Sequence, residues 1–161
     1  MQDTTSLLRS PEAVIAAHRV PDSMRQSPLH LLRRALQRYT AQWQATVGDV
    51  TPPQFAVLTS VGEYPGISQI DLGEVTGIDV ATLAPLVLRL EQRGLLNRDV
   101  DPANRRRRQL HLTPAGVAET ERILPLAEQV DGVMLDGLST PQRAALLAAL
   151  RSLSGMGGPA D

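Results

Sequence analysis

The chain has 161 residues, enough for one compact domain with terminal extensions, and 42% of them are hydrophobic, so it can bury a core. A net charge of −1 argues against a protein that simply coats nucleic acid, and the absence of cysteine excludes disulfides, thiolate catalysis and cysteine-ligated zinc. Only four residues are aromatic, so the core must consist of Leu, Val, Ile and Ala, which favours packed helices.

Charge is segregated along the chain. All 16 basic residues are arginine. Seven arginines stand against three acids between residues 89 and 108, whereas residues 114–136 hold five acids and one arginine. The first segment therefore suits an anionic partner and the second does not. No signal peptide and no apolar run of membrane-spanning length is visible, so we expect a cytoplasmic protein.

Helix signals recur through the first part of the chain. The apolar run 13–17 predicts a short helix. Ser27-Pro28 opens a longer one, in which apolar residues recur every three or four positions as far as Gly48. The segment Thr51–Gln54 combines a capping Thr, Pro at the first helical position and Gln three residues on, so a third helix runs from there to about Glu63.

Two shorter helices follow, separated by a tight turn. Ser68 caps a helix that runs through Val75, and residues 76–78 (Thr-Gly-Ile) form the turn. Asp79 caps the next helix, which ends at about Arg93. Two helices joined by a short turn that contains glycine predict a helix-turn-helix.

A basic β-hairpin is predicted directly after this unit. Residues 96–100 and 108–112 alternate with a period of two, and residues 101–104 (Asp-Pro-Ala-Asn) supply turn chemistry. Residues 105–108 are four consecutive arginines. Because arginine grips phosphate with a fork of donors and enters narrow minor grooves, the hairpin points to DNA. The order of helix, turn, helix and hairpin predicts a winged helix.

Two further helices are expected at the C-terminal end. Thr113-Pro114 begins one, with a kink expected at Pro125, and Ser139 begins the last. The expected organisation is an N-terminal extension and dimerisation helix (1–50), a winged helix-turn-helix domain (51–113), C-terminal dimerisation helices (114–155) and a flexible tail (156–161).

These motifs together resemble the multiple antibiotic resistance regulator (MarR) family of bacterial transcription factors. The likeness spans about residues 28–152 and is carried by Val50–Leu58, Pro65–Gln69 with Leu72, Arg89–Leu95, Asp101–Arg106 and Leu112–Gly116. The resemblance implies a mainly α fold: a winged helix-turn-helix with N- and C-terminal dimerisation helices and one small β-hairpin wing. It also implies a homodimer that binds a pseudo-palindromic operator in double-stranded DNA. Apolar helices at both chain ends agree with a dimer, although they could instead pack within one subunit.

The resemblance places DNA contacts on the helix after the turn, on the start of the preceding helix and on the wing. The candidates are Ser68, Gln69, Val80, Ala81, Thr82, Ala84, Pro85, Arg89, Asp101, Asn104, Arg105, Arg106 and Arg107. The family pattern has a second Asp at the position of Asn104. Because Asn104 lacks the negative charge that would hold an arginine, Asp101 is the expected anchor for the wing arginines. The alternative is that the arginines form an ordinary solvated face.

Many members of the family are repressors that small aromatic acids release, which implies a ligand site near the first long helix. The candidates are His18, Arg19, His30, Arg33, Arg34, Arg38, Tyr39 and Trp43. The basic groups would bind a carboxylate or phenolate, and Tyr39 and Trp43 would pack against the aromatic ring of the ligand. The alternatives are solvated arginines and a core position for Trp43.

The resemblance therefore implies a dimeric repressor that is released by a small aromatic ligand such as a hydroxylated benzoate or nicotinate, with aromatic compound catabolism as the expected process. A winged-helix protein-interaction module and a ligand-independent DNA-binding regulator are the alternatives. No enzyme is expected and no cofactor, because three scattered histidines and the absence of a glycine-rich phosphate loop provide no catalytic constellation. A metal sensor built from His and carboxylates has little support.

Overall fold

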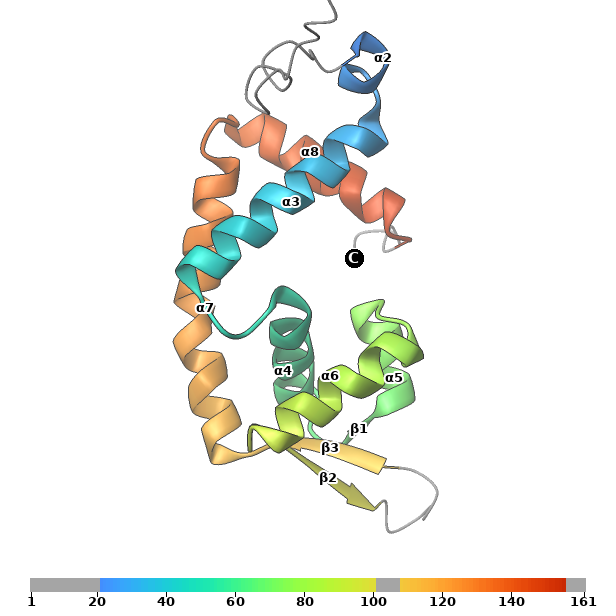
Figure 1. Ribbon diagram of the computed structural model, residues 1–161, viewed down its shortest axis with the longest axis vertical. Coiled ribbons are helices and arrows are strands. Elements are labelled where there is room, and N and C mark those ends of the chain that lie inside the picture. The colour runs from blue at the N-terminus through green and yellow to red at the C-terminus, as the bar shows by residue number, and fades with distance from the viewer. Residues whose placement is uncertain (1–20, 101–107, 156–161) are drawn as a thin grey trace, which may run out of the picture. The chain divides into compact units, whose positions relative to one another are not determined.

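The computed structural model describes residues 21–100 and 108–155, and the chain forms two compact units, residues 1–38 and 39–161. In the first unit α2 (Asp22–Arg25) precedes α3 (Pro28–Thr46), and α3 continues into the second unit (Figure 1). The Ser27 hydroxyl accepts a hydrogen bond from the backbone N–H of His30 at 3.4 Å, which confirms the predicted start of this helix. The predicted helix within residues 13–17 and the tail 156–161 lie outside the described residues.

The second unit contains the winged helix. Its elements are α4 (Pro52–Glu63), β1 (Ile67–Ser68), α5 (Gln69–Thr76), α6 (Val80–Gln92), β2 (Leu96–Val100), β3 (Arg108–Leu112), α7 (Pro114–Leu135) and α8 (Thr140–Leu153). The order of elements confirms the predicted mainly α fold. Figure 1 shows α5 and α6 beside each other and the hairpin of β2 and β3 next to them.

Polar caps and proline fix where the helices of this unit begin. At α4, the Thr51 hydroxyl accepts from the N–H of Gln54 at 3.4 Å, and the Gln54 side chain accepts from the N–H of Thr51 at 2.9 Å. At α7, the Thr113 hydroxyl accepts from the N–H of Gly116 and donates to the carbonyl of Gly94. Pro125 lies inside α7 without ending it.

A small antiparallel sheet has the strand order β1-β3-β2. In the predicted hairpin, Leu96 lies opposite Leu112 and Val100 lies opposite Arg108, so the alternation seen in the sequence is confirmed. Strand β1 adds a third member, with Ile67 opposite Leu110. The sequence predicted one hairpin only, because a two-residue strand is too short to show a period of two.

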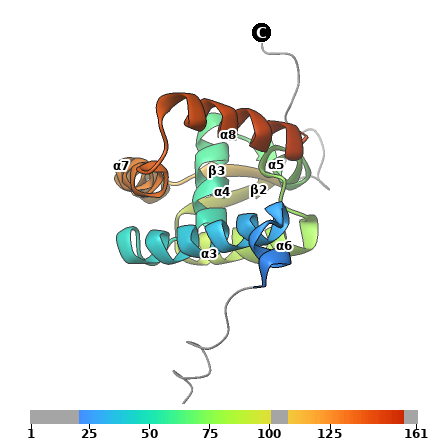
Figure 2. The ribbon, with the colours of Figure 1, turned by 90° about the horizontal axis from the view of Figure 1, so that it is seen from above.

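The core is aliphatic and is built around α4, α6 and the sheet. Leu58, Leu83 and Leu110 are fully buried in it, and in Figure 2 α4 crosses strands β2 and β3. Trp43 extends this core, with its indole N–H donating to the carbonyl of Val50 at 2.6 Å. This hydrogen bond satisfies the one polar atom of a buried indole.

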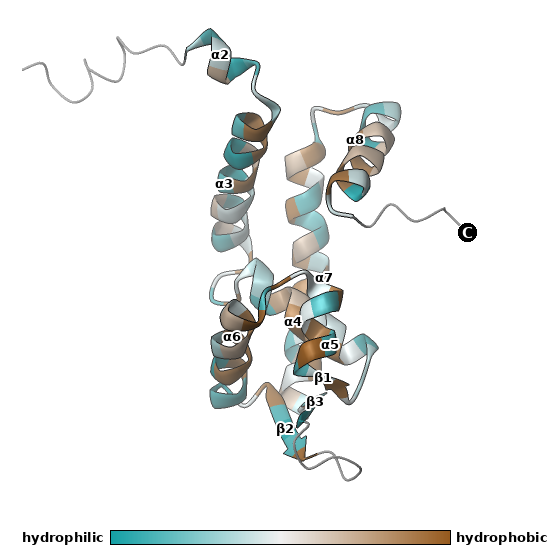
Figure 3. Ribbon diagram, turned by 90° about the vertical axis from the view of Figure 1, so that its right-hand side faces the viewer, coloured by the Kyte–Doolittle hydropathy of each residue, from teal (hydrophilic) through white to brown (hydrophobic). Residues whose placement is uncertain are grey.

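Helices α3 and α8 keep apolar side chains exposed within one chain. No residue of α8 is buried, and of α3 only Trp43 is. The exposed leucines are Leu29, Leu31, Leu32 and Leu36 in α3, and Leu146, Leu147, Leu150 and Leu153 in α8. In Figure 3, hydrophobic and hydrophilic bands alternate along α3. Among the described residues, no helix is both long enough and apolar enough to span a membrane.

Candidate DNA-binding interface and ligand pocket

The turn between α5 and α6 depends on one glycine and one aspartate. Gly77 ends α5 with φ of 66°, a left-handed conformation that suits glycine. Asp79 then caps α6, because its carboxylate accepts from the backbone N–H of Thr82 at 3.0 Å. Hydrogen bonds from the hydroxyl and the backbone N–H of Thr82 hold the pKa of Asp79 below its ordinary value. The cap therefore stays ionised and fixes where α6 begins.

Helix α6 has one buried and one exposed face. Leu83, Val87 and Leu90 are fully buried. The exposed face carries every residue that the sequence predicts as a DNA contact on this helix: Val80, Ala81, Thr82, Ala84, Pro85 and Arg89. The inward leucine and valine side chains thus fix the helix so that its candidate DNA-contacting residues face outward.

The two candidates before α5 have different surroundings. The Ser68 side chain is only 3% exposed, its hydroxyl accepts from the N–H of Asp71, and it donates to the Asp71 carboxylate at 2.7 Å. Its side chain therefore caps α5, and a DNA contact at Ser68 stays a prediction. Gln69 is half-buried at the first position of α5.

The wing is joined to α6 by an ion pair. Arg98 on β2 lies 2.8 Å from Glu91 in the last turn of α6, and both side chains are partly buried. Arg98 Nε is also buried, with no hydrogen-bond partner among the described residues. The remaining wing candidates, Asp101, Asn104, Arg105, Arg106 and Arg107, lie outside the described residues.

A second group of charges lies at the C-terminal end of α6. Arg93 lies 2.7 Å from the Asp49 carboxylate and 4.0 Å from Glu119 on α7. Glu119 accepts two hydrogen bonds from Arg122, at 2.8 and 3.0 Å. The hydrogen bond from Arg122 is the largest cause of a lowered pKa at Glu119. These contacts join the end of α6 to α7 and to the loop after α3.

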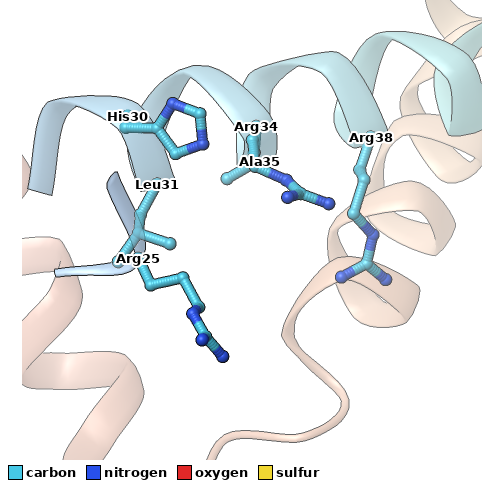
Figure 4. A pocket seen from close by; sticks show the side chains of 6 residues that line it. All are labelled: Arg25, His30, Leu31, Arg34, Ala35 and Arg38. Carbon is cyan, nitrogen blue, oxygen red and sulfur yellow. The ribbon is translucent and has the colours of Figure 1, made fainter. Parts of the chain in front are cut away.

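The first unit contains a basic cavity along α3. It has a volume of about 400 Å³, large enough for a single-ring ligand, and is lined by Arg25, His30, Leu31, Arg34, Ala35 and Arg38 (Figure 4). His30, Arg34 and Arg38 follow one another at intervals of four residues, which places them on one face of the helix. Three of the predicted ligand residues are thus brought together.

The cavity has an excess of positive charge. Arg25 forms an ion pair with Asp22 at 2.6 Å, whereas Arg34 and Arg38 have no ion-pair partner within the part of the chain that is described. His30 Nε2 is buried and lacks a hydrogen-bond partner there. Two guanidinium groups and one buried imidazole nitrogen therefore offer binding capacity to an anionic ligand.

The other ligand candidates are not brought to this cavity. Trp43 is 2% exposed in the core, with ring centroids 5.8 Å from Tyr39 and 5.4 Å from Phe55, and it does not line the cavity; this is the core position given above as the alternative. Tyr39 is half-buried and packs on the same core, and this burial, with the charge of Asp131, raises the pKa of its hydroxyl. Arg33 is exposed and does not line the cavity. His18 and Arg19 fall outside the described residues.

Several residues that organise these sites carry no clear signal in the sequence. Arg25 lines the cavity, and Arg93, Asp49 and Glu119 meet across elements far apart in the chain. Only the spacing of three residues between Glu119 and Arg122 could have signalled a contact. Residues 21–100 and 108–155 contain no group of three His, Asp or Glu side chains that could hold a metal ion.

Comparison with known proteins places this geometry in a family. Residues 50–107 match the MarR family. The chain is 36% identical over 131 residues to the transcriptional regulator HosA of Escherichia coli O111:H-, covering 81% of this chain and 97% of HosA. It also resembles the structure of Bordetella bronchiseptica BpsR, described with a mechanism for regulation of DNA binding by 6-hydroxynicotinic acid. That match has 40% identity and a TM-score of 0.72, and covers 78% of this chain and 96% of BpsR.

A third match is to a structure solved with nucleic acid. The transcriptional repressor CouR, bound to a 23-mer DNA duplex, is 28% identical with a TM-score of 0.78, and the match covers 86% of this chain and 99% of CouR. The matched regions include both the winged helix and the flanking helices. The chain therefore belongs to the MarR family and is a DNA-binding transcriptional regulator with a winged-helix fold.

Proposed function

We propose that this protein is a homodimeric repressor whose binding to a pseudo-palindromic operator is released by a small aromatic carboxylate or phenolate. The observation that carries the proposal is the basic cavity on α3, in which Arg34 and Arg38 have no ion-pair partner among the described residues. The similarity to BpsR, whose DNA binding 6-hydroxynicotinic acid regulates, supports this class of ligand. CouR is named a repressor, which supports repression rather than activation as the effect of DNA binding.

Dimerisation is proposed through α3 and α8. The exposed side chains of Leu29 and Leu36 in α3, and of Leu147 and Leu153 in α8, would be covered by the same helices of a second copy. Burying apolar surface contributes about 25 cal/mol per Å², so a contact of several leucines stabilises the dimer substantially. We accordingly propose that residues 1–50 hold an N-terminal extension and a dimerisation helix, and residues 114–155 the C-terminal dimerisation helices, on either side of the winged domain 51–113.

DNA contact is proposed through α6 and the wing. The first turns of α6 would enter the major groove, because the N-terminal residues of a recognition helix contact base edges. Arg105 and Arg106, at the turn of the wing, would enter the minor groove, with Arg107 on phosphate and with Asp101 and Asn104 shaping the turn. Gln69, half-buried at the start of α5, and Arg89, exposed on α6, would contact phosphates.

The ligand is proposed to act by selecting one dimer conformation. Two recognition helices must address half-sites about 34 Å apart. A carboxylate bound by Arg34 and Arg38, with a ring hydroxyl at His30, would favour a dimer with a different spacing. The ligand shifts this equilibrium only by the difference between its affinities for the two conformations.

DNA binding and dimerisation are tested with one duplex. A duplex from the promoter next to the gene is titrated with protein at several salt concentrations, and the mass of the free protein is measured by light scattering. We expect a dimer, specific binding and a steep loss of affinity with salt, since each neutralised phosphate releases counterions. Leu147→Asp should yield a monomer with weakened duplex binding. A wild-type monomer, or equal affinity for unrelated duplexes, would contradict the proposal.

A further inference from the structure

The exposed face of the first two turns of α6 is almost entirely apolar. Val80 is 58% exposed, and Ala81, Ala84 and Pro85 are exposed beside it. No asparagine, glutamine, lysine or arginine occupies these two turns. The side chains that make bidentate hydrogen bonds to adenine or guanine are therefore missing from the part of the helix that would approach the bases.

The acidic group at the start of these turns is engaged by the helix backbone. Thr82 is exposed, and its backbone N–H donates to the Asp79 carboxylate at 3.0 Å, which caps the helix. Asp79 is thus committed to the backbone rather than to a cytosine amino group. Apart from the Thr82 hydroxyl, the surface that these turns offer to a base pair consists of methyl and methylene groups.

Only one base presents such a group in the major groove. Thymine carries a C5-methyl there, whereas the other bases present hydrogen-bond donors and acceptors alone. Building on the proposed function, which places α6 in the major groove, we infer that Val80, Ala81 and Ala84 determine specificity by packing on thymine methyl groups. The small alanine side chains also let the helix backbone come close to the bases. The operator half-sites of this protein are thus thymine-rich where α6 lies.

Removing the methyl group while keeping the base pair tests this inference. Preferred duplexes are selected from a random-sequence pool with the full-length dimer. Affinity is then compared between the selected duplex and one in which uracil replaces thymine within the half-sites, since uracil pairs with adenine but lacks the methyl. We expect affinity to fall about fourfold for each packed methyl group that is removed. Uracil placed outside the half-sites should change the affinity for the duplex by less than about 1.5-fold.

Val80→Ala supplies the matching protein variant, and Val117→Ala on α7, an exposed valine of another helix, is its control. With Val80→Ala the uracil penalty at one or more thymines should fall below twofold, whereas Val117→Ala should keep the wild-type penalty. Equal affinity of wild-type protein for thymine and uracil duplexes would overturn the inference while leaving the proposed function intact. A pool that yields no preferred duplex would overturn both.

Discussion

The guanidinium group of Arg93 lies 2.7 Å from the carboxylate of Asp49, and this ion pair joins the C-terminal cap of α6 to the loop between α3 and α4. Because the Asp49 side chain is 73% exposed, the pair is solvated and contributes little to stability. The pair connects the end of α6, the proposed recognition helix, to the loop that follows α3.

We expect Arg93→Gln and Asp49→Asn each to lower the free energy of unfolding by less than about 1 kcal/mol. A double-mutant cycle measured by urea unfolding should give a coupling of about 0.2–1 kcal/mol, as for other exposed pairs. A coupling above about 2 kcal/mol would show that the pair is far more strongly coupled than its exposure implies.

Gly116 permits α7 to start against the backbone of Leu95, the residue before strand β2. A Cβ atom there would lie 2.0 Å from the backbone carbonyl oxygen of Leu95, which cannot move aside as a flexible side chain would. Gly116→Ala should therefore destabilise the fold by several kcal/mol, on the order of the largest point-mutant effects.

Gly132, later in the same helix, is the control for this substitution. A Cβ atom at Gly132 would have no heavy atom within 4 Å, so Gly132→Ala should stabilise α7 by about 0.5–1 kcal/mol. Thermal unfolding of both variants measures the difference. Similar melting temperatures for the two would be inconsistent with the close approach of α7 to Leu95.

Glu119 makes stability depend on pH. Its pKa in the folded protein lies below the ordinary value of 4.5, chiefly because Arg122 donates hydrogen bonds to it. A carboxyl with a lowered folded-state pKa stabilises the fold above its unfolded pKa and loses that contribution as the pH falls through the folded value. We expect wild-type protein to be more stable than Glu119→Gln at about pH 6, with the difference shrinking below pH 4.5.

Urea unfolding at pH values from about 7 to 3 measures this difference. Glu128→Gln removes a carboxylate from an exposed position of the same helix and controls for the change in net charge. If the wild-type and Glu119→Gln curves stay parallel over this range, Arg122 does not hold the carboxylate as described.

The wing is predicted to supply much of the DNA affinity. Arg105→Ala combined with Arg106→Ala should weaken duplex binding about tenfold or more. The slope of log affinity against log salt concentration should become shallower by about one for each phosphate that is no longer neutralised. Arg151→Ala, an exposed arginine of α8, controls for the lower positive charge. Unchanged affinity of the wing variant in a gel-shift titration would refute the assignment of these arginines.

Local signals in the sequence predicted most of the fold. Thr51, Asp79 and Thr113 are capping residues whose hydrogen bonds form as their spacing indicates, and the alternation around Leu96 and Leu110 identified the paired strands. Helix starts and strand alternation depend on residues that are neighbours in the chain, so a single sequence is enough to predict them.

Contacts between distant residues could not be predicted in the same way. Nothing in the sequence signals that Arg93 meets Asp49, 44 positions earlier, or that β1 adds a third strand. The apolar spacing of α3 allows a core position for Trp43 as well as a place beside a ligand. The carbonyl of Val50 that accepts the indole hydrogen bond has no signal in the sequence, because only the folded chain brings it to Trp43.

Release of a bound duplex by an aromatic acid tests the central claim most directly. Labelled operator duplex bound to the protein is titrated with 6-hydroxynicotinic, nicotinic and 4-hydroxybenzoic acids, and anisotropy reports its release. The wild-type protein should release the duplex with at least one of them. Arg34→Gln combined with Arg38→Gln should need at least about tenfold more acid. Arg33→Gln, on the same helix but outside the cavity lining, should behave as wild type. A duplex that none of these acids releases, or a double variant that responds like the wild type, would contradict the account.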